Sequence, residues 1–377
     1  MFSFLCDFLR PFTTSVTLAT LAITFAAATA QAEDRHLAGN QIAKVTETEA
    51  TVGFRHGSFI VAPIPFSNPL IGAGLALGAG YLFQADPASR TSMLGIGAMK
   101  SENGSEAHGL SFKLALDEDR WTFSSTLAEA NLNYDLLAGP VAIPLLQTGR
   151  FAKVQLDRKV ASNFKVGILG KYLDTDISSG NPNFSGLPGN YRLLGGLTTY
   201  SLGLVAEYDT RDSDLYPKDG THLVATALAN EVQSSSVTDY SKTTALFSHY
   251  TPIGAENVLA LRVAGCGTNG SVPFFDLCSI GGTDAMRGFN PTQYLGPRLL
   301  SAQAEYRHRL SDRFGFVAFA GAGGVGSSFD ALNRNGYAGG VGLRYRVSKK
   351  IPVNFAVDMS FNDDGESLLY ISVGERF

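Results

Sequence analysis

Apolar and polar residues alternate in twos along much of this chain. In the run 300–310, one set of alternate positions is mainly apolar: Leu300, Ala302, Ala304, Tyr306, His308 and Leu310. The intervening positions are polar: Ser301, Gln303, Glu305, Arg307 and Arg309. A period of two puts successive side chains on opposite faces of a β-strand. A soluble sandwich buries the apolar face in a core, whereas a membrane barrel turns it to lipid and lines its lumen with the polar face.

Segments of this length recur and predict sixteen strands. We place them at 53–62, 72–83, 91–100, 105–116, 120–134, 149–159, 164–173, 199–208, 220–232, 240–251, 256–266, 298–310, 313–325, 337–347, 352–361 and 368–377. Single-chain bacterial outer-membrane barrels have an even number of strands. The pattern therefore predicts an all-β fold, a sixteen-stranded antiparallel transmembrane β-barrel.

The lengths of the predicted connections alternate as well. Five joints are short: 84–90, 117–119, 161–163, 311–312 and 348–350. Four joints of the other set are longer: 135–148, 174–198, 267–297 and 327–336. Short periplasmic turns and long outer loops are typical of outer-membrane barrels. The loop 267–297 lies between the eleventh and twelfth strands, which makes it the sixth outer loop.

Two motifs resemble one protein family. Gly-Gly-Thr-Asp-Ala-Met-Arg-Gly-Phe occupies residues 281–289, and Ala-Glu-Tyr-Arg follows at 304–307. A second stretch, 208–223, reads Tyr-Asp-Thr-Arg-Asp-Ser-Asp-Leu-Tyr-Pro-Lys-Asp-Gly-Thr-His-Leu. Both resemble the bacterial surface-antigen family, which includes the BamA/TamA-type assembly factors and the two-partner-secretion transporters. The resemblance covers roughly residues 50 to 377 and implies a sixth extracellular loop folded back into the lumen.

Arg287 is the main candidate functional residue, at the tip that the resemblance folds into the lumen. A desolvated guanidinium without a carboxylate is costly, and the polar strand faces offer Glu305 and Asp358. A planar bidentate pair with either would hold the tip against the wall. The rest of the motif is expected to permit close backbone approach and packing: Gly281, Gly282, Gly288 and Phe289. The alternative is an ordinary surface loop with a solvated arginine.

One position departs from the family. The family often has an acidic residue in the thirteenth strand, two positions after an aromatic one. Here Gly321 stands two positions after Phe319. The departure favours Asp358 or Glu305 as the partner of Arg287 and leaves open whether the loop is locked as in the family.

The N-terminal residues predict export. Arg10 precedes a largely apolar run at 16–28, and Ala-Gln-Ala at 30–32 fits a signal-peptidase site. We therefore divide the chain into a signal peptide at 1–32, a short periplasmic segment at 33–50 and the barrel at 51–377. A membrane anchor helix is the alternative for the first segment. BamA-type relatives carry repeated periplasmic receptor (POTRA) domains before the barrel. The segment 33–50 is too short for one, so we expect a member with the barrel alone.

Composition and the remaining residues add four expectations. Charged residues make up 17% of the chain, below the usual share of about 25%, and the net charge is −4 without a dense basic run, so no nucleic-acid partner is expected. In an exported protein, Cys266 and Cys278 are candidates for a disulfide at the base of a loop.

The terminal Phe377 resembles the C-terminal assembly signal of outer-membrane barrels. Outer-membrane lipid is an expected partner.

Enzymatic and metal chemistry are not indicated. Neither His-Glu-x-x-His nor Gly-x-Ser-x-Gly occurs among the residues of the chain. Asp209 and three further aspartates crowd one turn, but their spacing does not fit a calcium loop. A polar turn in which Asp209 pairs with Arg211 is the expected structure. We expect no cofactor, no metal and no enzyme.

The function expected from the resemblance is insertion or translocation of protein or lipid at the outer membrane. The route would be the barrel or the seam between its first and last strands. A separate periplasmic receptor protein and a client protein or lipid are the expected partners. Two alternatives stay open. The barrel could be a passive, porin-like solute channel, or it could be a surface structural or adhesive protein that uses the loop 174–198.

Overall fold

A computed structural model describes residues 54, 57–139, 141–179, 195–234, 237–254, 256–281, 285–346 and 354–376. In this part of the chain, sixteen antiparallel strands form one closed barrel. The first eight are β1 (Ser58–Asn68), β2 (Gly72–Phe83), β3 (Ser92–Ser101), β4 (Glu106–Leu116), β5 (Trp121–Ala138), β6 (Val141–Ala161), β7 (Phe164–Ser179) and β8 (Gly195–Asp209). The other eight are β9 (Gly220–Gln233), β10 (Tyr240–Ile253), β11 (Asn257–Gly270), β14 (Arg298–Arg309), β15 (Phe314–Gly326), β16 (Leu332–Arg346), β17 (Asn354–Asn362) and β18 (Ser367–Val373).

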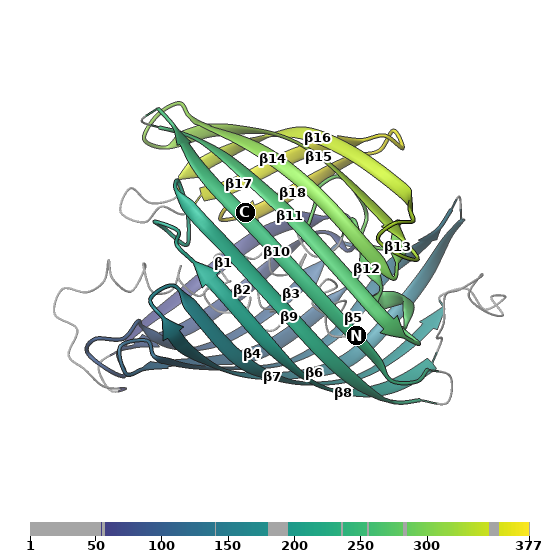
Figure 1. Cartoon of the computed structure of the whole chain (residues 1–377), viewed down its shortest axis with the longest axis horizontal. Helices are drawn as coiled ribbons and strands as arrows, with labels where there is room; N and C mark the ends of the chain where they lie inside the picture. The colour runs from purple at the N-terminus through teal and green to yellow at the C-terminus, as the bar shows by residue number, and fades with distance from the viewer. Residues whose placement is uncertain are drawn as a thin grey trace.

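The strands run obliquely around the wall, each paired with its neighbours along the chain, and β1 pairs with β18 to close the ring (Figure 1). The segment between β11 and β14 holds a short 3-10 helix, η4 (Phe274–Asp276). It also holds β12 (Cys278–Ser279) and β13 (Leu295–Gly296), which pair with each other in a separate two-stranded sheet. None of the helices in the described residues is long and apolar enough to span a membrane.

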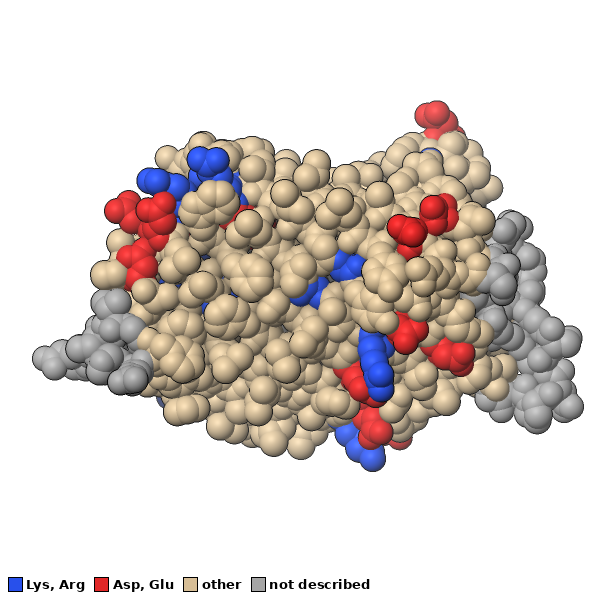
Figure 2. All heavy atoms as spheres, turned by 90° about the horizontal axis from the view of Figure 1, so that it is seen from below, with Lys and Arg blue, Asp and Glu red and all other residues tan. Residues whose placement is uncertain are grey.

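Side chains alternate between exposed and buried along the strands, as the period of two predicts. On β8, Leu202 and Leu204 are each 66% exposed, while Ser201, before this pair, and Val205, after it, are buried. On β14, Leu300 is exposed and Glu305 is fully buried. The face seen in Figure 2 therefore carries a broad stretch of mostly uncharged residues, with one group of charged side chains at its left end and others scattered over its right half. The prediction of a sixteen-stranded antiparallel barrel is confirmed.

The observed strands differ from the predicted ones in two instructive places. The long loop expected at 135–148 does not form, because β5 continues to Ala138 and β6 begins at Val141. Beyond the apolar band the alternation on β5 changes phase, because outward Asn131 and Asp135 are polar while inward Leu132 and Leu136 are apolar and buried. The first strand begins later and ends later than predicted, since it runs through Pro63 and Pro65. Proline is normally excluded from paired strands unless one edge lacks a full ladder.

Candidate functional site

The segment between β11 and β14 is fastened at its base. A disulfide joins Cys266 on β11 to Cys278 on β12, and both cysteines are buried. The side chain of Asp276 lies 3.1 Å from the Nζ atom of Lys242 and accepts a hydrogen bond of 2.6 Å from the hydroxyl of Tyr240, both on β10. The pairing of β12 with β13 then returns the chain on itself. The base is thus held covalently and by a buried ion pair, and the residues between the two short strands form the tip.

Arg287 at the tip contacts three strands. Its Nη1 atom lies 2.7 Å from Oδ2 of Asp358 on β17, and its Nη2 atom donates to Glu305 on β14. Its Nε–H donates to the side-chain oxygen of Gln303 at 3.1 Å. The guanidinium carbon lies 3.6 Å from the centre of the Phe319 ring on β15. With 2% of its surface exposed, Arg287 is not a solvated surface arginine.

These contacts belong to a larger ionic network. Glu305 also binds Nε of Arg307 at 2.7 Å, and Asp358 also binds Arg344. Arg344 in turn lies 2.8 Å from Oε2 of Glu375, which follows β18. The network contains as many carboxylates as guanidinium groups, and no side chain in it is more than 4% exposed. Each buried charge therefore has a partner, which is the condition under which burial of ions is tolerated.

Gly288 and Phe289 fit closely beside Arg287. Gly288 has a φ of 116°, and a Cβ atom there would lie 2.3 Å from the Cβ of Ala338. Its N–H donates to the hydroxyl of Tyr370 at 2.9 Å, and its carbonyl accepts from Asn362 at 2.8 Å. Phe289 is fully buried. Only glycine combines this backbone angle with this approach.

Gly281 meets the same kind of limit at the start of the motif. A Cβ atom on Gly281 would lie 2.3 Å from the carbonyl oxygen of Phe289, so the two ends of the motif touch. Gly282 and Phe377 lie outside the described residues. Gly321 registers with Gln303 and supplies no carboxylate. The ring of Phe319, two residues earlier, stacks on Arg287 from this strand.

The structure brings together both candidate partners of Arg287 that the sequence left as alternatives. It adds three contacts that the sequence analysis did not predict. Gln303 and Phe319 contact Arg287 directly, and Arg344 contacts its partner Asp358. A signal for Gln303 existed, since it shares the polar face of β14 with Glu305. Arg344 could not be assigned in the same way, because its contact with Asp358 depends on the register between β16 and β17.

The turn between β8 and β9 reaches the same network from the other end of the barrel. Arg211 pairs with Asp209 at 2.8 Å, as the sequence predicted. Further along the turn, Tyr216 is buried, and the carbonyl of Pro217 accepts a hydrogen bond of 3.3 Å from Arg307. Burial raises the pKa of the Tyr216 hydroxyl. Through Arg307, the turn is connected to Glu305 and so to the loop tip.

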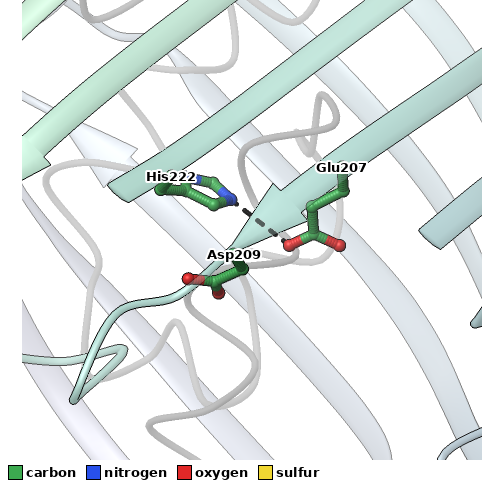
Figure 3. Close-up of side chains that lie close together, drawn as sticks. All are labelled: Glu207, Asp209 and His222. Atoms are coloured by element: carbon green, nitrogen blue, oxygen red, sulfur yellow. Dashed lines mark hydrogen bonds and ion pairs between the residues drawn. The ribbon is translucent and has the colours of Figure 1, made fainter. Parts of the chain in front are cut away.

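A cluster at the start of this turn has metal-binding residue types. Glu207, Asp209 and His222 point toward one another, with their ligand atoms within 4.8 Å (Figure 3). However, Lys165 lies 3.1 Å from Glu207, and Arg211 holds Asp209. These two cations already neutralise the two carboxylates, and a metal ion would have to displace them. We therefore assign the cluster to the structure of the barrel end.

A closed wall, an exposed apolar band and a largely polar buried interior define the class of this protein, which is a transmembrane β-barrel. The Omp85 superfamily domain matches residues 145–377, so the chain belongs to the Omp85 superfamily. This membership agrees with the expectation that the chain is not an enzyme. Comparison with curated proteins found no match to this sequence.

Solved structures share the fold at low sequence identity. BamA from Haemophilus ducreyi lacking POTRA domains 1–3 is 15% identical with a TM-score of 0.62, and the match covers 84% of this chain and 70% of that one. CdiB from Escherichia coli is 12% identical with a TM-score of 0.57, covering 89% and 69%. CdiB from Acinetobacter baumannii is 12% identical with a TM-score of 0.54, covering 84% and 59%. At these identities the similarity establishes the fold.

Proposed function

We propose that this barrel assists the insertion or translocation of protein or lipid at the outer membrane. In this proposal the segment 271–297 is the sixth extracellular loop, folded back into the lumen. Its support is the set of partners that bind Arg287, because Gln303, Glu305 and Asp358 all lie on strand faces opposite to the exposed apolar residues. A lumen closed in this way disfavours the centre of the barrel as the route.

The observation that carries the proposal is the seam between β1 and β18. In the described residues these strands register at a single pair, Ser67 with Ile371. On its other side β1 registers with β2 along its whole length, from Ser58 to Asn68. Pro63 and Pro65 lack the N–H group that a full ladder with β18 would need. The barrel is thus closed, but it is joined least firmly where its first and last strands meet.

An incompletely paired edge in a membrane supplies a mechanism. In hydrocarbon, backbone N–H and C=O groups must find hydrogen-bond partners within protein, and an open strand edge readily pairs with another chain. A client strand could therefore exchange hydrogen bonds with β1 while β18 separates from it. The proposal includes a separate periplasmic receptor that delivers the client, a cleaved signal peptide and an assembly signal at Phe377.

A cross-link across the seam tests this mechanism. The double variant Ser67→Cys/Ile371→Cys places a disulfide at the one registered pair of the seam. The assay measures how fast a small eight-stranded outer-membrane barrel becomes protease-resistant in vesicles that contain this protein. We expect the unlinked protein to speed folding of this probe client, the oxidised variant to lose that effect, and reduction to restore it.

A matched cross-link distinguishes the seam from general rigidity. Leu204→Cys/Ala227→Cys joins registered, outward-facing residues of β8 and β9, where pairing is continuous. This variant should retain activity when oxidised. If the seam cross-link leaves the folding rate unchanged, exchange at the seam is ruled out. If the unlinked protein does not speed folding at all, insertion of barrel clients is ruled out.

A further inference from the structure

A groove crosses the outer surface of the barrel from β1 to β7. It has a volume of about 740 Å³ and is lined chiefly by apolar atoms. It lies between two rows of outward side chains that register across neighbouring strands. Val61 on β1, Ile96 on β3 and Leu127 on β5 belong to the first row, and Leu77 on β2 and Glu129 on β5 belong to the second.

Small residues account for the hollow. Between the two rows, Gly78, Gly97 and Gly109 register with one another on β2, β3 and β4, so the floor consists of backbone. The outward residues beside this floor include Ala98 and Ala152, whose side chains end at Cβ. Elsewhere the apolar band carries large leucine, valine and phenylalanine side chains. This part of the wall is therefore depressed relative to its surroundings.

One end of the groove is polar. His108, Glu129 and Arg150 register directly across β4, β5 and β6 and face outward. Arg150 lies 3.5 Å from Glu129, and its side chain is 73% exposed. The other end of the groove, at Val61 and Leu77, is apolar. The groove is thus amphipathic along its length.

The polar end is the end nearer the outer surface. On β5 the outward residues before Glu129 are mainly apolar, beginning at Trp121, and those after it are polar as far as Asp135. Glu129 therefore marks the edge of the apolar band. The apolar end lies deeper, because Val61 is close to the periplasmic end of β1 at Ser58. Barrel strands tilt by about 35–45°, so a row that crosses them at right angles descends through the membrane.

We propose that the groove is a binding site for a phosphorylated lipid of the outer leaflet. The phosphate lies against Arg150 and His108, and one acyl chain follows the groove down to Val61 on the seam strand β1. A guanidinium offers five N–H donors. Arg150 can therefore bind a phosphate with some of them while its ion pair with Glu129 fixes the orientation of the guanidinium. The orientation of the groove also matches that of the lipid. A lipid of this leaflet has its charged headgroup toward the outer surface and its acyl chain toward the middle of the membrane, as the groove has its polar and apolar ends. The proposal rests on the outer-membrane barrel and is independent of the insertion activity.

Photo-cross-linking tests the site. The full-length protein is reconstituted in vesicles of phosphatidylethanolamine and phosphatidylglycerol, with a diazirine at the acyl end of the phosphatidylglycerol. Mass spectrometry then locates the adducts. We expect adducts concentrated at Val61, Leu77 and Ile96. Ala152→Phe, which fills the groove from the lipid side, should remove this concentration, and Arg150→Gln should lower it about fivefold by removing one cationic contact near the membrane surface.

Two matched variants control for folding and for general lipid contact. Ala206→Phe enlarges an outward alanine on β8 outside the groove, and Arg158→Gln removes an outward arginine at the periplasmic end of β6. Both should leave the adduct pattern unchanged, and heat-modifiable gel mobility should show every variant as a folded barrel. Adducts spread evenly around the barrel, or a pattern that Ala152→Phe and Arg150→Gln do not change, would show ordinary annular lipid and overturn the proposal.

Discussion

Arg287 shows how much of the site a sequence can predict. Both of its carboxylate partners follow from parity, because Glu305 and Asp358 occupy polar positions on otherwise alternating strands. The alternation along the strands could not distinguish between the two carboxylates, and in the structure Arg287 contacts both. The stacking of Phe319 and the support from Arg344 depend on strand register and on the depth to which the loop tip reaches, which no local pattern encodes.

Loss of the Arg287 side chain should release the loop tip. In Arg287→Ala, Glu305 retains its ion pair with Arg307, and Asp358 retains its ion pair with Arg344. The network then has one uncompensated negative charge. We expect a loss of about 3 kcal/mol in the free energy of unfolding, at the low end for a broken buried pair. Urea unfolding in vesicles, followed by tryptophan fluorescence, measures this loss.

Arg313→Ala is the control at the residue scale. Arg313 is exposed and donates to the hydroxyl of Tyr345 at 2.9 Å near a turn. Its removal should change stability by no more than about 0.5 kcal/mol. Equal stability of the two variants would show that the Arg287 contacts contribute nothing to holding the loop.

At the scale of elements, alternation predicts strands well wherever one face meets lipid. It fails beyond the apolar band, where the outward residues of β5 become polar while inward Leu132 and Leu136 are apolar. It also fails at β1, where Pro63 and Pro65 resemble the end of a strand. The second failure is informative. The same two prolines that obscure β1 in the sequence also leave it without two backbone donors. An apparent turn signal therefore lies on the strand at which we propose hydrogen-bond exchange.

Replacing these prolines should close the seam. Pro63→Val/Pro65→Val restores two N–H groups and keeps outward apolar side chains of high β propensity. We expect greater protection of β18 amides from hydrogen exchange and slower folding of the probe client. Val61→Thr, an outward substitution on the same strand that adds no donor to the backbone, should change neither. Unchanged protection in the proline variant would mean that backbone donors do not limit the pairing of β1 with β18.

For the whole molecule, the segment between β11 and β14 is connected to the turn between β8 and β9. The tip of the 271–297 segment and the turn that carries Tyr216 and Pro217 meet in one neutral ionic network. The sequence predicts the barrel itself, from strand number and from the alternating lengths of the connections. It does not predict this connection, because the residues involved are separated by most of the C-terminal half of the chain.

A barrel closed in this way should conduct little. In planar bilayers we expect the intact protein to be nearly silent and a variant with residues 271–297 replaced by a short Gly-Ser linker to show large, steady conductance. The physical reason is that polar strand faces would then line an open aqueous path. A large steady conductance of the intact protein would favour the solute-channel alternative instead.

The contacts of the loop tip also carry information about the order of assembly. The hydrogen bonds that join Arg287 and Gly288 to β14, β17 and β18 lead to residues later in the chain. Arg287 is therefore synthesised before Glu305, Asp358 and Tyr370, and its contacts with β17 cannot form until the final hairpin has joined the wall. Seating of this one arginine is a late event that reports a finished ring, so a chain that stalls with its last strands unpaired would keep the tip accessible to proteases and chaperones.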